Sequence, residues 1–185
     1  MGGVQKSIVE LTILYKNIMN FLIKCIDPSI DLILFYGSLL GYYRDSNFIN
    51  LDDDIDIILS RAHFDILKTN IKKNIHLYPT IRIGIEKDDI LQLYDGENGH
   101  FDLYPFDELD DDILIKWDGN LLFEKKQIFP LQRVSFHGIT ISVPHDIEPV
   151  VLQIYGSNWK IAQIKDIDYH WKEINTVRKI RNKRR

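Results

Sequence analysis

The sequence predicts one domain of mixed α/β class that opens with the order helix, strand, helix, strand. Apolar residues near the N-terminus recur at steps of three and four, which is typical of an amphipathic helix. Short apolar runs bounded by Gly, Pro, Asp or Ser follow, and these predict buried strands. With 185 residues, of which 45% are hydrophobic, the chain is long enough to bury a substantial core.

These patterns divide the first 75 residues into five elements. An amphipathic helix carries apolar residues from Val4 to Leu22 and ends before Asp27-Pro28. Ser38 is the expected N-cap of a short helix, because a serine hydroxyl can accept a hydrogen bond from a free backbone N–H. The elements expected after the first helix are a strand over 31–36, a helix over 39–44, a strand over 55–60 and a helix over 61–74.

The second half of the sequence is rich in predicted strands. Alternating patterns predict strands over 80–87, 89–95 and 100–107, and a hairpin of 132–138 with 139–144. A helix is expected over 146–156, with Asp146 as its cap and Gly156 as its end. The acidic segment 107–113 lacks strand alternation, so we expect a solvated loop there.

The charge distribution argues against one large class of function. The net charge is −4, yet residues 171–185 hold seven basic residues and one acidic residue. The remaining body is therefore acidic, which disfavours general nucleic-acid binding, where neutralisation of phosphates dominates affinity. We expect residues 1–185 to form one domain whose basic tail, from about residue 171, is a solvated terminus. The alternative is that this tail contacts an anionic membrane or polymer.

The sequence carries no signal for export or for membrane insertion. No apolar run approaches the roughly 20 residues that a membrane-spanning helix needs, and no basic region precedes the apolar positions at the N-terminus. The single cysteine, Cys25, excludes an intramolecular disulfide and a zinc site built from cysteines. We therefore expect a cytoplasmic protein without a membrane span.

Two short motifs place a phosphate cradle before a pair of carboxylates. Gly37-Ser38 follows a strand and turns the chain into a helix, whose N-terminal N–H groups suit a phosphate. The next strand begins with Asp54, Ile55 and Asp56. Side chains two residues apart on a strand share one face, so both carboxylates point the same way, about 6 to 7 Å apart. Such a pair can bracket a hard cation such as Mg²⁺.

The predicted strand over 100–107 repeats this arrangement. Phe101 and Leu103 should face one way, while His100, Asp102 and Tyr104 should face the other. Asp102 is thus the natural third carboxylate. His100 is expected either to orient a carboxylate by hydrogen bonding or to have a plain structural role. In outline, these motifs indicate metal-assisted phosphoryl or nucleotidyl transfer.

Three sequence blocks resemble the LicD-type phosphotransferases, a family related to fukutin and the fukutin-related protein. The blocks are GSLLGYYRDSNFINLDDDIDI, HFDLYPFD and IFPLQRVSFHGITISVPHDIEPVVLQIYG, and they follow in the family's order between Phe35 and Trp159. The resemblance implies a minimal nucleotidyltransferase fold of the polymerase-β type, which is an α/β (α+β) fold with a mixed sheet flanked by helices. It also implies transfer of a phospho-alcohol or phospho-sugar group, such as phosphocholine or ribitol phosphate. The donor would be CDP-linked and the acceptor a sugar hydroxyl of a glycan.

By matching position, the resemblance assigns roles to particular residues. Gly37 and Ser38 would line the nucleotide phosphates, and Arg44 would contact a donor phosphate. His100 would belong to the substrate-binding set. The cofactor would be Mg²⁺, with Mn²⁺ as an alternative. The catalytic and metal-binding carboxylates would be Asp54, Asp56 and Asp102.

Several residues keep alternative interpretations. Asp52 and Asp53 are expected to be solvated or to support the metal ligands from behind, and Arg44 can instead form an ion pair with the acidic cluster. The aromatic residues Tyr42, Tyr43 and Tyr94 can stack on a base or a choline ammonium, although packing in the core or at its rim is favoured. The family often has an aromatic residue where this chain has Leu51.

Two other functions stay open at this point. The same carboxylates could serve a nucleotidyltransferase that attaches a whole nucleotide to a protein, an RNA or a small molecule. The chain could also be a non-catalytic module that binds a glycan or a nucleotide. An intact Gly-Ser pair with all three carboxylates argues against that module, because a decayed site has no reason to keep them.

Overall fold

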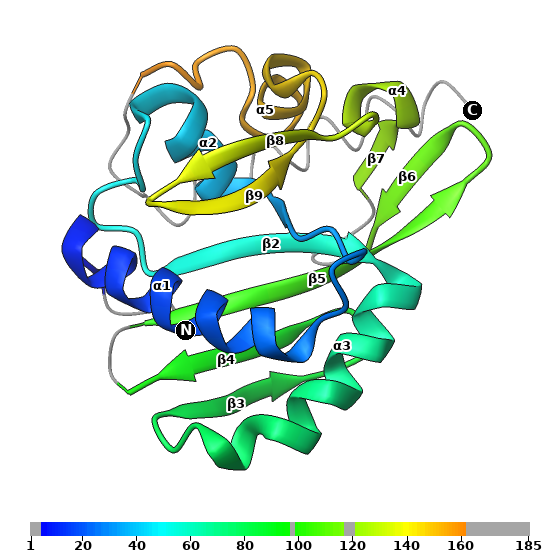
Figure 1. Ribbon diagram of the computed structural model, residues 1–185. Coiled ribbons are helices and arrows are strands. Elements are labelled where there is room, and N and C mark those ends of the chain that lie inside the picture. Colours follow the sequence, from blue (N-terminus) through cyan, green and yellow to red (C-terminus); the bar gives the residue numbers. More distant parts are fainter. Residues whose placement is uncertain (1–4, 97–98, 117–120, 162–185) are drawn as a thin grey trace.

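The computed structural model describes residues 5–96, 99–116 and 121–161 (Figure 1). The basic tail from about residue 171 lies outside the described residues, as does Val4. The helices are α1 (Ile8–Cys25), α2 (Tyr36–Asp45), α3 (Arg61–Asn74), α4 (Lys125–Ile128) and α5 (Ile147–Tyr155), with a 3-10 turn at Ile75–Leu77. The strands are β1 (Ile33–Leu34), β2 (Asp54–Ser60), β3 (Ile81–Glu86), β4 (Leu91–Asp95), β5 (His100–Leu109), β6 (Asp112–Ile115), β7 (Leu121–Glu124), β8 (Gln132–Phe136) and β9 (Ile139–Val143).

The strands form one mixed sheet, which confirms the predicted fold class. The order along the sheet is β3-β4-β5-β2-β1-β9-β8, and the hairpin of β6 and β7 extends from the end of β5. The pairs β2–β5 and β1–β9 are parallel, and the other pairs are antiparallel. Because β2 and β5 are far apart in the sequence, this parallel pairing is the step that brings the two predicted carboxylate motifs together.

Helices α1 and α3 pack on one face of the sheet (Figure 1). Helix α1 begins at Ile8 because Ser7 and Glu10 form a capping box: the Glu10 N–H donates to Ser7 Oγ, and the Ser7 N–H donates to Glu10 Oε2. It ends at Cys25, before Asp27-Pro28 as predicted. Helix α2 packs against β2 and α5. None of the helices among the described residues is long and apolar enough to cross a membrane.

The prediction for Ser38 was wrong in its detail. Helix α2 starts at Tyr36, three residues earlier than expected, and its N-cap is Phe35. Ser38 therefore lies inside the first turn of the helix. Its hydroxyl accepts a hydrogen bond from the backbone N–H of Asp56 at 3.0 Å. The serine ties α2 to the start of β2 rather than capping its own helix.

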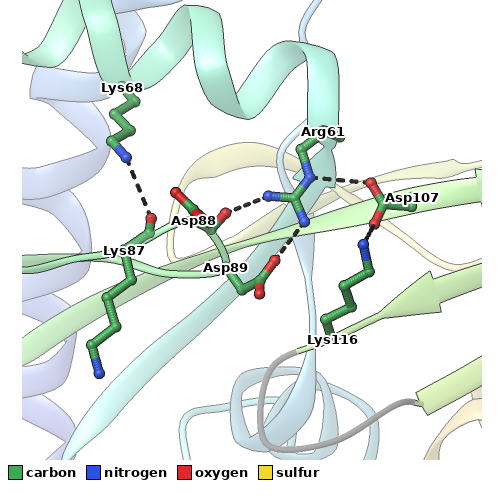
Figure 2. Close-up of polar contacts among 7 residues, drawn as sticks. All are labelled: Arg61, Lys68, Lys87, Asp88, Asp89, Asp107 and Lys116. Atoms are coloured by element: carbon green, nitrogen blue, oxygen red, sulfur yellow. Dashed lines mark hydrogen bonds and ion pairs between the residues drawn. The ribbon is translucent and has the colours of Figure 1, made fainter.

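The expected loop over residues 107–113 is mostly strand. Strand β5 continues to Leu109 and β6 begins at Asp112, so only a tight turn separates them. Figure 2 shows how the charge of this segment is balanced: Arg61 Nε donates to Asp107 Oδ1 at 3.1 Å, and Lys116 Nζ lies 2.7 Å from Asp107 Oδ2. Both cations lie outside the acidic run. The strand pairing of this segment with β6 is a tertiary contact, and no alternating pattern within the run indicates it. Strand β7 and helix α4 were not predicted either.

The C-terminal elements follow the prediction closely. The hairpin of β8 and β9 turns at His137 and Gly138, whose φ angles of +48° and +82° suit a primed two-residue turn. Asp146 occupies the N-cap position of α5, although its side chain makes no capping hydrogen bond. Gly156, with a φ of +78°, ends that helix as predicted.

Candidate active site

The parallel register of β2 and β5 places the predicted acidic residues side by side. Asp54 lies opposite His100, and Asp56 lies opposite Asp102. His100 Nε2 is 3.6 Å from Asp54 Oδ2 and 3.8 Å from Asp102 Oδ2. One ligand atom from each of Asp54, His100 and Asp102 can be chosen so that all three lie within 4.8 Å of one another. A single cation could therefore contact all three side chains.

A second group of carboxylates shares one member with the first. Asp52, Asp53 and Asp54 also offer oxygens within 4.8 Å of one another. Asp52 is only 3% exposed, so the expectation that it is solvated was wrong. It is buried because residues before α1 pair with its segment: the Lys6 N–H donates to the Asp52 carbonyl at 2.7 Å. No pattern in the sequence predicts this pairing with Lys6, which is itself buried.

Asp102 is a buried carboxyl group whose pKa is raised. Burial raises its pKa to about 6, the charge of Asp54 adds to this, and His100 acts in the opposite direction. Its Oδ2 accepts a hydrogen bond from the Tyr104 hydroxyl at 2.9 Å. Its Oδ1 is buried and makes no hydrogen bond of normal geometry with the described residues. A buried oxygen without a donor is costly, and a bound cation would satisfy it.

The neighbouring carboxylate charges favour the protonated, charged form of His100. Burial disfavours its protonated form, but the interaction with Asp54 and the charges of Asp102 and Asp54 outweigh burial and raise its pKa. His100 thus lies beside two carboxylates at distances longer than a normal hydrogen bond, and its role in orienting them stays a prediction. An imidazole beside two carboxylates is also a ligand set that suits Mn²⁺ better than Mg²⁺, which prefers oxygen ligands alone.

Gly37 allows α2 to approach the carboxylates closely. A Cβ atom at this position would lie 2.9 Å from Asp52 Oδ2 and 3.4 Å from Asp56 Oδ2. The Gly37 N–H instead donates to Asp56 Oδ2 at 3.1 Å. Asp56 belongs to neither of the two candidate metal-binding groups among the described residues. Its carboxylate binds the helix N-terminus in this structure, where a negative charge is stabilised.

Buried tyrosines surround the acidic residues, and the sequence analysis did not identify them as part of the site. Burial, together with the charges of Asp56 and its neighbours, raises the pKa of Tyr104 and of Tyr155 well above the ordinary value. Their hydroxyls therefore stay protonated and can donate hydrogen bonds. Tyr36 packs edge-to-face on Tyr104, with ring centroids 5.5 Å apart, and has a φ of +39°. That left-handed backbone, rare for a bulky residue, lies directly before Gly37.

Arg44 lies near the end of α2 and binds a neighbour. Its Nε and Nη2 atoms donate to the two carboxylate oxygens of Asp45 at 2.9 and 2.7 Å. A longer contact of 3.5 Å joins Nη1 to the Trp159 carbonyl. The alternative that Arg44 pairs with the central acidic cluster is therefore not what the structure shows. Its role as a phosphate contact stays a prediction.

The remaining predicted residues have clear positions. Tyr42 packs edge-to-face on Phe136, and Tyr43 packs on Trp159, which agrees with a packing role. Tyr94 lies beside His100, with ring centroids 5.7 Å apart. Leu51, which replaces the family's aromatic residue, is 51% exposed and has a φ of +67°.

A family model described as LicD/FKTN/FKRP, nucleotidyltransferase domain, matches residues 29–146. The chain belongs to this family. Membership supports a transferase that uses a nucleotide-derived donor. The matched range of the LicD domain holds Gly37 and both strands that carry the acidic residues. Helices α1 and α5 lie outside it, so Lys6 and Tyr155 reach the site from flanking segments.

Solved structures show the same fold at low sequence identity. The lincosamide antibiotic adenylyltransferase LnuA, in a lincomycin-bound crystal structure, matches with a TM-score of 0.52 and 17% identity over 88% of this chain and 96% of that one. A solution structure of the antibiotic-resistance factor ANT(2'')-Ia matches with a TM-score of 0.51 and 12% identity, over 94% and 91% of the two chains. Comparison of the sequence with curated proteins gives no match. The LicD-family chain thus has a nucleotidyltransferase-like fold.

Proposed function

We propose that this LicD-family protein is a divalent-metal-dependent transferase. It moves a phospho-alcohol or phospho-sugar group from a nucleotide-activated donor, most simply a CDP-linked one, to a sugar hydroxyl of a glycan. The observation that carries the proposal is the register of β2 with β5, which gathers Asp54, His100 and Asp102 within reach of one cation. Asp102 Oδ1, which is buried and has no hydrogen bond of normal geometry with the described residues, would suit such a cation.

Each residue of the site would have a separate role. Asp54 and Asp102, with His100, hold a Mg²⁺ or Mn²⁺ ion, which neutralises negative charge on the donor phosphates when bound. Gly37 gives the phosphates access to the N-terminus of α2, where backbone N–H groups and the helix dipole favour an anion. Asp56 faces the same helix end, and its carboxylate accepts the hydrogen bond from the Gly37 N–H that a donor phosphate would need. We keep Arg44 as a residue that contacts a phosphate of the nucleotide donor; its guanidinium would have to release Asp45 to do so.

The transfer step exchanges one P–O bond for another. The acceptor oxygen forms a bond to the donor's distal phosphorus, and the bond from that phosphorus to the bridging oxygen breaks. The bridging oxygen leaves as part of a nucleoside monophosphate, and a carboxylate accepts the proton of the acceptor hydroxyl.

A nucleotidyltransferase is the second candidate, because the two solved structures with the same fold are named as an adenylyltransferase and an antibiotic-resistance factor. In that reaction the acceptor oxygen attacks the α-phosphorus of a nucleoside triphosphate, and pyrophosphate leaves. The leaving group therefore separates the two functions: a nucleoside monophosphate for the first and pyrophosphate for the second.

A ligand screen tests the proposal directly. Thermal shift and calorimetry with Mn²⁺ or Mg²⁺ would compare CTP, CDP-choline, CDP-ribitol, CDP-glycerol, UDP-sugars and GDP-mannose. A ligand present at 100 times its dissociation constant stabilises the native state by about 2.7 kcal/mol, which is easily measured. We expect a CDP-alcohol to raise the midpoint in the wild type and in Asp110→Ala, which alters an exposed turn, but not in Asp54→Ala. Stabilisation by nucleoside triphosphates alone would favour the nucleotidyltransferase, and unchanged binding in Asp54→Ala would refute the metal site.

A further inference from the structure

A row of side chains leads away from the acidic residues across three neighbouring strands. The strand registers place Asp54 opposite His100, His100 opposite Tyr94, and Tyr94 opposite Arg82. Residues that are opposite one another in a sheet point to the same face, so all four side chains share one face. With strands about 4.8 Å apart, the row extends about 14 Å from Asp54 to the far strand.

The Tyr94 ring comes close to the backbone of β3 because that strand has a glycine, Gly84, at this position. A Cβ atom on Gly84 would lie 2.1 Å from Cε2 of Tyr94 and 2.8 Å from Cδ2, so no other residue fits under the ring. The Tyr94 hydroxyl donates to Gln92 Oε1 at 2.7 Å, which fixes the ring in this position. Since Gly84 is exposed, this part of the sheet face is accessible to solvent. The ring thus offers a fixed aromatic surface next to His100.

Arg82 ends the row with a cation that has no carboxylate partner among residues 5–96, 99–116 and 121–161. Its guanidinium carbon lies 5.4 Å from the centre of the Tyr94 ring, and Nη2 makes a 3.4 Å contact with the Gly96 carbonyl. The side chain is exposed, on a protein body that is otherwise acidic. An Arg that packs on an aromatic ring but leaves its donors open is well placed to bind a phosphate or a carboxylate.

The direction of the row fits the side from which an acceptor must come. In phosphoryl transfer the attacking and leaving oxygens lie roughly in line, on opposite sides of the phosphorus. The Gly37 end of α2 follows β1, which neighbours β2 on one side. The row with Tyr94 and Arg82 leaves β2 on the other side, through β5, β4 and β3. A donor at α2 and an acceptor on the row would therefore meet at the acidic residues from opposite sides.

We propose that Tyr94 and Arg82 form the acceptor subsite, and that the acceptor is a sugar carrying an anionic group, either a phosphate or a carboxylate. Arg82 binds the anionic group, and the Tyr94 ring supports the apolar face of the sugar. The reacting hydroxyl then points along the row toward Asp54. Calling this site an acceptor subsite rests on the proposed transferase function, but the binding of an anionic sugar to it can be measured without any donor.

The test compares four proteins in NMR titrations with defined probes: glucose 6-phosphate, glucuronate, glucose and inorganic phosphate. Arg82→Gln removes the cation. Gly84→Ala leaves it in place but displaces the Tyr94 ring. Arg133→Gln is the matched control, because Arg133 is also an exposed arginine on a strand but lies on β8, at the opposite edge of the sheet. The rise in melting midpoint with Mn²⁺ is recorded for each variant and should equal that of the wild type, which shows that fold and metal site are intact.

We expect the wild type and Arg133→Gln to bind glucose 6-phosphate or glucuronate more tightly than glucose. Arg82→Gln should weaken that binding about 10-fold or more, as expected for loss of a hydrogen bond between charged groups. Gly84→Ala should weaken binding of the anionic sugar but not of inorganic phosphate. Whichever anionic sugar binds more tightly identifies the group that Arg82 recognises.

Three results would overturn the inference: no binding of either anionic sugar, equal losses in Arg82→Gln and Arg133→Gln, or inorganic phosphate binding as tightly as glucose 6-phosphate with no effect of Gly84→Ala. The last result would mean an adventitious ion only. Failure of the proposed function has a different signature. In that case no nucleotide stabilises the wild type, while binding of the anionic sugar still depends on Arg82.

Discussion

Replacing Asp102 by Asn should make the metal-free protein more stable while removing its ability to respond to a divalent cation. Asp102 is 4% exposed, and its Oδ1 makes no hydrogen bond of normal geometry with the described residues, although Gln92 interacts with the carboxyl group and opposes the rise of its pKa. An ionised carboxylate in this position is costly, because burial removes its hydration without supplying a full set of partners. Asparagine has nearly the same shape, and its side-chain oxygen can still accept the hydrogen bond from Tyr104.

The size and pH dependence of this effect follow from the pKa. Burial raises the pKa of Asp102 from 3.8 to about 6 in the folded protein. At about 1.4 kcal/mol per pH unit, ionisation therefore lowers the free energy of unfolding by about 3 kcal/mol. Because the folded-state pKa is the higher one, this loss begins as the pH rises above about 4 and is complete a little above pH 6. The advantage of Asp102→Asn should grow over that interval and then stay constant.

Urea unfolding in EDTA at pH 4, 5, 6 and 7.5 measures this difference, and the same samples with Mn²⁺ measure the loss of metal-induced stabilisation. Asp95→Asn is the control, since Asp95 is equally buried on β4 but its Oδ2 accepts a hydrogen bond from Asn17 at 2.5 Å. That variant should keep the response to Mn²⁺, because Asp95 belongs to neither candidate metal-binding group among the described residues. If metal-free Asp102→Asn were less stable than the wild type at pH 7.5, or if the difference did not change with pH, the reasoning about burial would be refuted.

Two further predictions concern residues outside the acidic cluster. Gly41→Ala should lower the free energy of unfolding by about 1 to 3 kcal/mol. The new Cβ would lie 2.5 Å from the Asn47 carbonyl oxygen and 2.9 Å from the Ile49 N, and these backbone atoms cannot rotate away as a side chain can. A chemical denaturation series showing a gain in stability would contradict this prediction. Burial, helped by the charge of Lys16, lowers the pKa of His137, so its contribution to stability is present above about pH 6.5 and is lost as the pH falls. His137→Asn, which tolerates the same left-handed turn, should therefore lose less stability between pH 7.5 and pH 5 than the wild type does, and an unchanged pH dependence in thermal unfolding would count against this role.

Local patterns were enough to predict most elements and the motifs of the site. The end of α1 before Asp27-Pro28, the alternation of β3, β4 and β5, and the turn at His137-Gly138 are all set by neighbours in the sequence. Strand alternation also predicted that Asp54 and Asp56 share a face, and that His100 and Asp102 do. The local pattern failed for the acidic segment 107–113, whose strand residues are paired between β5 and β6 and whose Asp107 binds Arg61 and Lys116.

The sequence by itself therefore determined the fold class, the family and the residue types of the site, because short-range periodicity and motif spacing are properties of neighbouring residues. Only the tertiary structure decided which of those residues meet. The parallel register of β2 with β5 makes His100 a partner of Asp54, and it gives Asp102 its buried position and raised pKa. Packing also brought Tyr155 to the acidic residues and laid Tyr94 over Gly84. These are contacts between segments far apart in the chain, and their energies depend on burial and distance, which no local pattern contains.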